Sequence, residues 1–89
     1  MDFPALHSAL LDLRTTLLAT GKPHGRTSLY NAIRDGLWTK PVRAGTRSVA
    51  WPAREVEALN AARIAGKTDD EIRTLVRRLE SARVAADAP

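Results

Sequence analysis

The side chains best suited to molecular recognition lie between residues 26 and 36, where the sequence reads RTSLYNAIRDG. At about 100° per residue around a helix, Leu29, Ala32 and Ile33 share one arc, and hydroxyl, phenol, amide and guanidinium groups occupy the other. Such groups hydrogen-bond to phosphate oxygens and to base edges in a DNA major groove. The spacing therefore predicts a recognition helix, although the same pattern also fits a merely solvated helix face. Its candidate DNA-contacting residues are Arg26, Thr27, Ser28, Tyr30, Asn31 and Arg34.

The positive charge of the chain is concentrated in its middle third. The net charge is +4, and residues 21–54 hold seven basic residues against Asp35 alone, which gives +6 there and −1 on each side. A confined basic patch is typical of polyanion binders, because each neutralised phosphate releases counterions. The alternative is a basic surface that binds no nucleic acid.

Other functions find little support in the sequence. The 89 residues allow one domain, and the absence of cysteine excludes a disulfide framework and a thiolate zinc site. His7 and His24 lack partners at metal-ligand spacing, and no phosphate loop or catalytic pair is evident. No run reaches the roughly 18 apolar residues of a membrane span. We predict a soluble cytoplasmic protein, associated with the nucleoid when bound to DNA, with no enzymatic activity, cofactor, metal or membrane contact.

Two short helices separated by a turn are expected first. Residues 3–13 have leucines at helical spacing and suggest a loose amphipathic turn. A first helix follows from Arg14 to about Gly21, with Leu17 and Leu18 as its core face. The turn at residues 22–25 precedes the recognition helix, which Thr27 or Ser28 can cap and Gly36 ends.

The sequence then changes period and predicts a β-hairpin wing. Val42, Val49 and Trp51 suggest one inward face, with the turn at residues 44–46. Trp38 and Trp51 are expected in the core rather than stacked on bases. The further candidate DNA-contacting residues, on the wing and its flanks, are Lys22, Lys40, Arg43, Thr46 and Arg47.

Two helices are expected after the wing. The first begins near Pro52 and ends at Gly66. The second opens with a capping box formed by Thr68 and Glu71 and runs to about Val84. Its apolar stripe predicts an oligomerisation surface, with packing inside the same chain as the alternative. The stripe residues are Ile72, Leu75, Val76 and Leu79.

Several segments together resemble the AlpA-like regulators, small winged helix-turn-helix proteins of prophages and integrative elements, related in fold to the MerR and excisionase groups. The resemblance spans residues 11–79. It rests on LDL before the first helix, TG at its end, RTSLY, GLWTKPV, RSVAWP followed by EV, and the tail TDDEIRTLVRRL. The turn at residues 21–25 is about two residues longer than the family's, and Thr39 replaces a proline, which is expected to loosen the entry to the wing.

The resemblance implies a mainly α fold with a small β-hairpin wing, that is, a winged helix-turn-helix plus a C-terminal helix. We divide the chain into an N-terminal extension (1–12), the DNA-binding domain (13–66) and a C-terminal helix (67–89). The implied function is double-stranded DNA binding at an attachment site or promoter. The protein would act as an excisionase, or recombination directionality factor, with a tyrosine integrase, and as a homo-oligomer on DNA. The alternatives are an AlpA-type transcriptional activator and, in another class, a protein-interaction module that uses the C-terminal helix.

Overall fold

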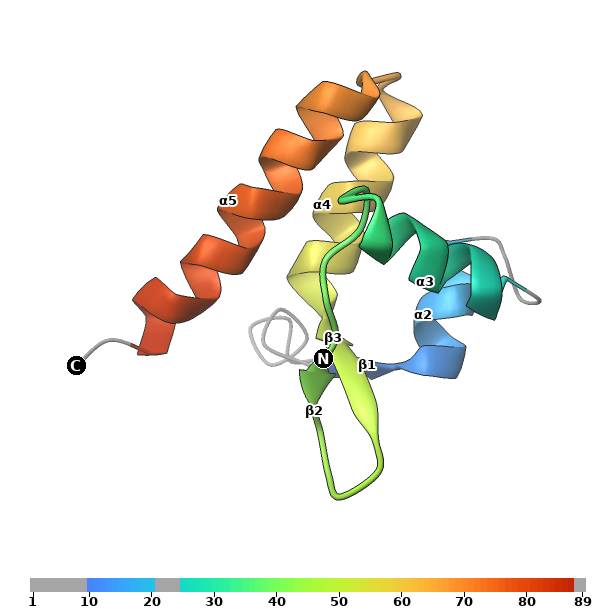
Figure 1. Ribbon diagram of the computed structural model, residues 1–89, viewed down its shortest axis with the longest axis vertical. Helices are drawn as coiled ribbons and strands as arrows, with labels where there is room; N and C mark the ends of the chain where they lie inside the picture. Colours follow the sequence, from blue (N-terminus) through green and yellow to red (C-terminus); the bar gives the residue numbers. More distant parts are fainter. Residues whose placement is uncertain (1–9, 21–24, 88–89) are drawn as a thin grey trace, which may run out of the picture.

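The protein is mainly helical, with a small antiparallel sheet. The computed structural model describes residues 10–20 and 25–87, and its elements follow the order β1 (Leu10–Asp12), α2 (Leu13–Ala19), α3 (Arg26–Arg34), β2 (Val42–Arg43), β3 (Val49–Pro52), α4 (Ala53–Ile64) and α5 (Asp69–Asp87). Figure 1 shows the β2–β3 hairpin projecting away from the helices, α3 beside α2, and α5 returning from its turn with α4. The predicted winged helix-turn-helix with an additional C-terminal helix is confirmed.

The wing is part of a three-stranded sheet rather than an isolated hairpin. Within the described residues the strand order is β1-β3-β2, with antiparallel neighbours. The amphipathic turn expected over residues 3–13 is wrong for residues 10–12, because these form the strand that pairs Leu11 with Trp51. Residues 10–12 therefore belong to the sheet, although our division assigned them to the extension.

The register of the sheet corrects the predicted inward face of the wing. Val42 pairs with Ala50, whereas Arg43 pairs with Val49. Directly opposed residues point to the same side of a sheet, and neighbours along a strand point to opposite sides. Val49 and Trp51 therefore share a face with Arg43, and Val42 lies on the other face.

Helix α2 is held by side-chain hydrogen bonds at both of its ends. Asp12 caps α2 by accepting a hydrogen bond from the amide of Thr15 at 2.8 Å. This bond is the largest cause that lowers the pKa of the Asp12 carboxyl. At the other end, Asn60 Nδ2 of α4 donates to the carbonyl oxygen of Ala19 at 3.0 Å. Leu17 is buried as predicted, but Leu18 is 58% exposed and does not belong to the core.

Glycines end α3 and α4 in the same way. Gly36 and Gly66 have φ values of 78° and 77°. After α3, Leu37 N donates to Ala32 O at 2.8 Å and Gly36 N donates to Ile33 O at 3.1 Å. This is the Schellman pattern, which requires a left-handed residue after the helix. The predicted stops at both glycines are confirmed, whereas Gly21 lies outside the described residues.

The core forms where α3, β3, α4 and α5 meet. Trp51 and Leu59 have no exposed surface, and Trp38 is 2% exposed, so the prediction that both tryptophans are core residues is confirmed. The rest of the buried apolar cluster is Leu17, Leu29, Val56, Ile72 and Val76. Burial of such side chains stabilises a domain by about 1.5–3 kcal/mol each.

Helix α5 uses its apolar stripe to pack against this core. Ile72 and Val76 are 7% and 4% exposed, and Leu75 and Leu79 pack against the same cluster at partial burial. The oligomerisation role predicted for this stripe is wrong for Ile72 and Val76, because their side chains are already covered within the chain. The alternative, intramolecular packing, describes the stripe.

The capping box at the start of α5 is confirmed. The amide of Thr68 donates to Glu71 Oε1 at 2.9 Å, and the amide of Glu71 donates to Thr68 Oγ1 at 3.2 Å. The hydrogen bond from the Thr68 amide is the main cause that lowers the pKa of Glu71. The helix ends at Asp87, three residues beyond the predicted end.

Candidate nucleic-acid interface

Helix α3 presents the predicted polar side chains on its outer face. Leu29 is 6% exposed and anchors the helix, with Ala32 and Ile33 packed against the core cluster. The exposed residues are Arg26, Thr27, Ser28, Tyr30, Asn31 and Arg34. The predicted two-arc division of this helix is therefore confirmed, while contact of the outer arc with DNA stays a prediction.

The start of α3 differs from the expected cap. The helix begins at Arg26 with Gly25 as its N-cap, and no side chain caps it. Thr27 and Ser28 lie inside the first turn, so the prediction that one of their hydroxyls caps the helix is wrong. Both residues are exposed on the helix surface, where their hydroxyls can bind an external partner.

Tyr30 connects α3 to the sheet. Its ring meets the ring of Trp51 edge to face, with centroids 6.5 Å apart and planes at 69°. The residue is still 37% exposed. Such a contact contributes about 0.5–1.5 kcal/mol beyond the buried area. Tyr30 therefore has two roles open to it, as an anchor of α3 on β3 and as a contact on the outer face.

The wing carries Arg43 on the side of the sheet that faces α3. Arg43 shares a face with Trp51, and Trp51 contacts Tyr30 of α3. Arg43, Thr46 and Arg47 are exposed. The amide of Ala44 donates to Ser48 O at 2.9 Å and closes the turn between the strands. Arg43 is thereby directed to the side of the molecule on which α3 lies.

Arg34 forms an ion pair that does not immobilise it. Its Nε lies 3.5 Å from Asp35 Oδ1, and the two side chains are 72% and 51% exposed. Exposed pairs of this kind contribute about 0–1 kcal/mol. Arg34 can therefore exchange this partner for a phosphate or a base edge at little cost.

The entry to the wing is held firmly. Thr39 is fully buried, and its carbonyl oxygen accepts a hydrogen bond from Trp51 Nε1 at 2.8 Å. The next residue, Lys40, has its amide bonded to Glu80 Oε2 at 2.8 Å. The expectation that Thr39 loosens this segment is wrong, because the neighbouring peptide groups are bonded to β3 and to α5.

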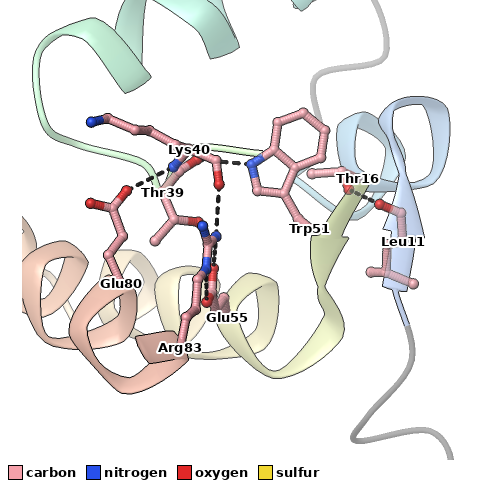
Figure 2. A network of polar contacts seen from close by, with 8 residues as sticks. All are labelled: Leu11, Thr16, Thr39, Lys40, Trp51, Glu55, Glu80 and Arg83. Atoms are coloured by element: carbon pink, nitrogen blue, oxygen red, sulfur yellow. Dashed lines mark hydrogen bonds and ion pairs between the residues drawn. The ribbon is translucent and has the colours of Figure 1, made fainter. Parts of the chain in front are cut away.

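Sequence reasoning missed the polar network beneath the wing entry (Figure 2). Glu55 of α4 is 1% exposed, and both its oxygens accept hydrogen bonds from Arg83 of α5, from Nε at 2.7 Å and from Nη2. The same Nη2 donates to Lys40 O at 2.7 Å. The only sequence signal was a glutamate on the apolar side of a predicted helix, without any indication of its partner.

The remaining predictions concern absent features or undescribed residues. Lys22, the other predicted DNA-contacting residue, and most of the turn before α3 lie outside the described residues. In residues 10–20 and 25–87, no three His, Cys, Asp or Glu side chains gather as a metal site. Over the same residues, no helix is long and apolar enough to cross a bilayer.

One comparison with known proteins gives a match. The family model described as prophage CP4-57 regulatory protein (AlpA) matches residues 11–64, which include α2, α3, the wing and α4. No curated protein and no solved structure shows significant similarity to the chain. The matched segment contains every predicted DNA-contacting residue.

Proposed function

The chain belongs to the AlpA family of prophage regulatory proteins, and we propose that it binds double-stranded DNA with α3 in the major groove and the wing against the backbone or minor groove. The family is a regulatory rather than an enzyme family. The proposed contacts are Arg26, Thr27, Ser28, Tyr30, Asn31 and Arg34 on α3, and Lys22, Lys40, Arg43, Thr46 and Arg47 on the wing and its flanks.

The main support for this proposal is that α3 and Arg43 of the wing lie on the same side of the sheet. Tyr30 on α3 packs edge to face on Trp51, and Arg43 lies on the same face of the sheet as Trp51. A recognition helix in the major groove places an adjoining wing over the neighbouring backbone. The exposed side chains of both elements therefore suit one continuous duplex.

The chemistry of the two elements divides the expected roles. Asn31 can pair with adenine and Arg34 with guanine in the major groove. Arg43 and Arg47 on the wing are suited to phosphates, which fix the pose without reading sequence. Affinity is therefore expected to depend on both elements, and sequence preference mainly on α3.

A salt titration tests DNA binding. If Lys22, Arg26, Lys40, Arg43 and Arg47 each neutralise one phosphate, the slope of log K against log salt is about −4.5. Fluorescence anisotropy with a 40-base-pair duplex measures this slope. An affinity that does not change with salt would refute the proposal.

Matched variants separate phosphate contacts from base readers. Arg47→Ala should reduce the slope by about 1 and weaken binding to all sequences alike. Asn31→Ala should lower discrimination between duplexes by about 1–3 kcal/mol per base pair read. Arg78→Ala is the control, because it removes the same charge from a residue outside the proposed interface. Arg78 lines a groove of the α4–α5 hairpin together with Lys67 and Glu71. A slope change in this control equal to that of Arg47→Ala would remove the wing from the proposal.

Within DNA binding, we propose that the protein acts as an excisionase with a tyrosine integrase. Several copies would bind neighbouring sites and bend the attachment DNA, with the bending cost offset by added contacts. The candidate alternative is an AlpA-type transcriptional regulator, which the family description as a regulatory protein favours. Both roles use the same interface.

Reconstituted recombination distinguishes the two roles. Purified protein and its cognate integrase are incubated with a plasmid that carries both attachment sites, without RNA polymerase. Stimulated excision supports the directionality role, and Arg47→Ala should reduce it together with DNA affinity. No stimulation at saturating DNA occupancy would reject this role and leave the transcriptional one. The protein-interaction alternative is weakened, because Ile72 and Val76 of its proposed surface are buried.

A further inference from the structure

The connector between α3 and the wing, residues 35–41, is hydrogen-bonded to α5 at both of its ends. At the α3 end, Arg73 Nε donates to Asp35 O at 3.0 Å. At the wing end, Glu80 Oε2 accepts from the amide of Lys40 at 2.8 Å, and Arg83 Nη2 donates to Lys40 O at 2.7 Å. These three side chains project from one helix to backbone atoms 38–43 positions away in sequence.

The three side chains share one side of α5. At 100° per residue, Glu80 lies about 20° from Arg73 around the helix axis, and Arg83 lies about 80° from it. The side that bonds the connector is therefore adjacent to the apolar stripe that packs on the core. A single rigid helix consequently fixes the distance between the end of α3 and the start of the wing.

Arg83 is itself fixed before it reaches Lys40. Its guanidinium forms a two-point contact with Glu55 of α4, a geometry that restricts the orientation of the planar group. On the other side of the connector, Trp51 Nε1 holds Thr39 O. Figure 2 shows the peptide groups of Thr39 and Lys40 held between Trp51 on one side and Glu80 with Arg83 on the other.

We propose that Glu80 and Arg83 are positioning residues for DNA binding, which set the place of the wing relative to α3 without touching DNA themselves. The inference rests on the proposed function. Its main support is that these side chains bond backbone atoms of Lys40, the residue from which the wing departs. A stabilising contact alone does not require three side chains of one helix to converge on the two ends of one connector.

Glu80 offers the cleaner test, because its contact with Lys40 is exposed and its loss leaves no buried charge. Glu80→Ala removes the acceptor for the Lys40 amide. Glu80→Gln makes the same change in net charge but keeps an acceptor oxygen. A difference between the two variants therefore reports the hydrogen bond and not the charge.

The probe is a duplex selected by the wild-type chain from a random-sequence pool, with binding measured by fluorescence anisotropy. Glu80→Ala should weaken binding about tenfold, within the range seen when residues that do not touch a ligand alter its binding, and Glu80→Gln should stay within about twofold. Thermal unfolding should show that both variants are folded at the assay temperature, so that weaker binding by Glu80→Ala, which loses the hydrogen bond to the Lys40 amide, is not caused by unfolded protein.

A double-mutant cycle shows whether Glu80 acts through the wing. Arg43→Ala should weaken binding less in the Glu80→Ala background than in the wild type, because a displaced wing has already lost the Arg43 contact. Independent, multiplicative losses would overturn the positioning role, as would wild-type affinity in Glu80→Ala. If the wild-type chain selects and binds no duplex, the proposed function fails and the inference falls with it.

Discussion

Removal of the cation beside Glu55 should be the most damaging single change in the polar network. Glu55 is 1% exposed, and the side chain of Arg83 is 20% exposed. Arg83→Met retains much of the side-chain length but leaves a buried carboxylate without its partner. Breaking a buried pair costs about 3–5 kcal/mol. Because solvent partly reaches Arg83, we expect a loss of about 3 kcal/mol, at the lower end of this range.

Urea unfolding followed by far-UV circular dichroism measures this loss. With a denaturant slope of about 1.5 kcal/mol/M for a domain of this size, the midpoint should fall by about 2 M. The double variant Glu55→Met/Arg83→Met removes both charges and should recover most of the loss, since apolar replacement of a buried pair is often neutral. Arg78→Met on exposed helix surface is the control and should change stability by less than about 0.5 kcal/mol.

Two results would refute this reasoning. A loss below about 1 kcal/mol in Arg83→Met would place the pair among exposed ion pairs. Equal losses in the single and double variants would show that the unpaired Glu55 carboxylate is not the cause. In that case the destabilisation would come from the lost hydrogen bond between Arg83 and the carbonyl oxygen of Lys40, which both variants remove.

Three further predictions concern local geometry. Gly36→Ala should lower the free energy of unfolding by about 1–2 kcal/mol, because φ is +78° there and a left-handed conformation strains alanine. Gly45→Ala is the control and should be near neutral, because its new methyl group meets only Ser48, at 3.7 Å. Equal losses in the two variants would contradict the role of the positive φ at Gly36. Trp51→Phe should cost about 1–3 kcal/mol, because it leaves the buried carbonyl of Thr39 without its donor, and an unchanged urea midpoint would exclude that role. The pKa of Glu71 is lowered from 4.5 by its hydrogen bond with the Thr68 amide. The ionised carboxylate therefore contributes fully to folding stability above pH 4.5, and this contribution is lost as the pH falls through the lower pKa of the folded state. Glu71→Gln should therefore lose less stability than the wild type between about pH 6 and pH 3, and parallel losses in the two proteins would contradict this.

The sequence predicts well the features that depend on neighbouring residues. The two arcs of α3 follow from 3.6-residue periodicity, the helix stop at Gly36 follows from its conformational freedom, and the capping box follows from the spacing of Thr68 and Glu71. Each depends on residues within a few positions of one another. The exposed character of the candidate interface was predictable on the same basis, since the outer arc of a helix is defined by its core arc.

The features that sequence reasoning missed depend on pairs distant in the chain. The strand at residues 10–12 has no signature of its own and exists because Leu11 finds Trp51 in β3. The register of the wing places Val42 opposite Ala50, which alternation within one strand cannot reveal. The bond between Glu55 and Arg83 spans 28 positions. Such pairings are set by how the elements pack, and local patterns do not encode them.

The length of α5 has a structural reason that its sequence pattern alone did not indicate. Helix α4 has 12 residues and is about 18 Å long, and α5 runs back along it from Asp69 to Arg83, which bonds Glu55 in the first turn of α4. These 15 residues of α5 span about 22 Å, enough to cover α4 and to reach the connector at Lys40. An oligomerisation role is therefore not needed to explain the long helix. If copies of the protein assemble on DNA, Ile72 and Val76 are already buried within one chain, so the contacts between copies must come from other residues.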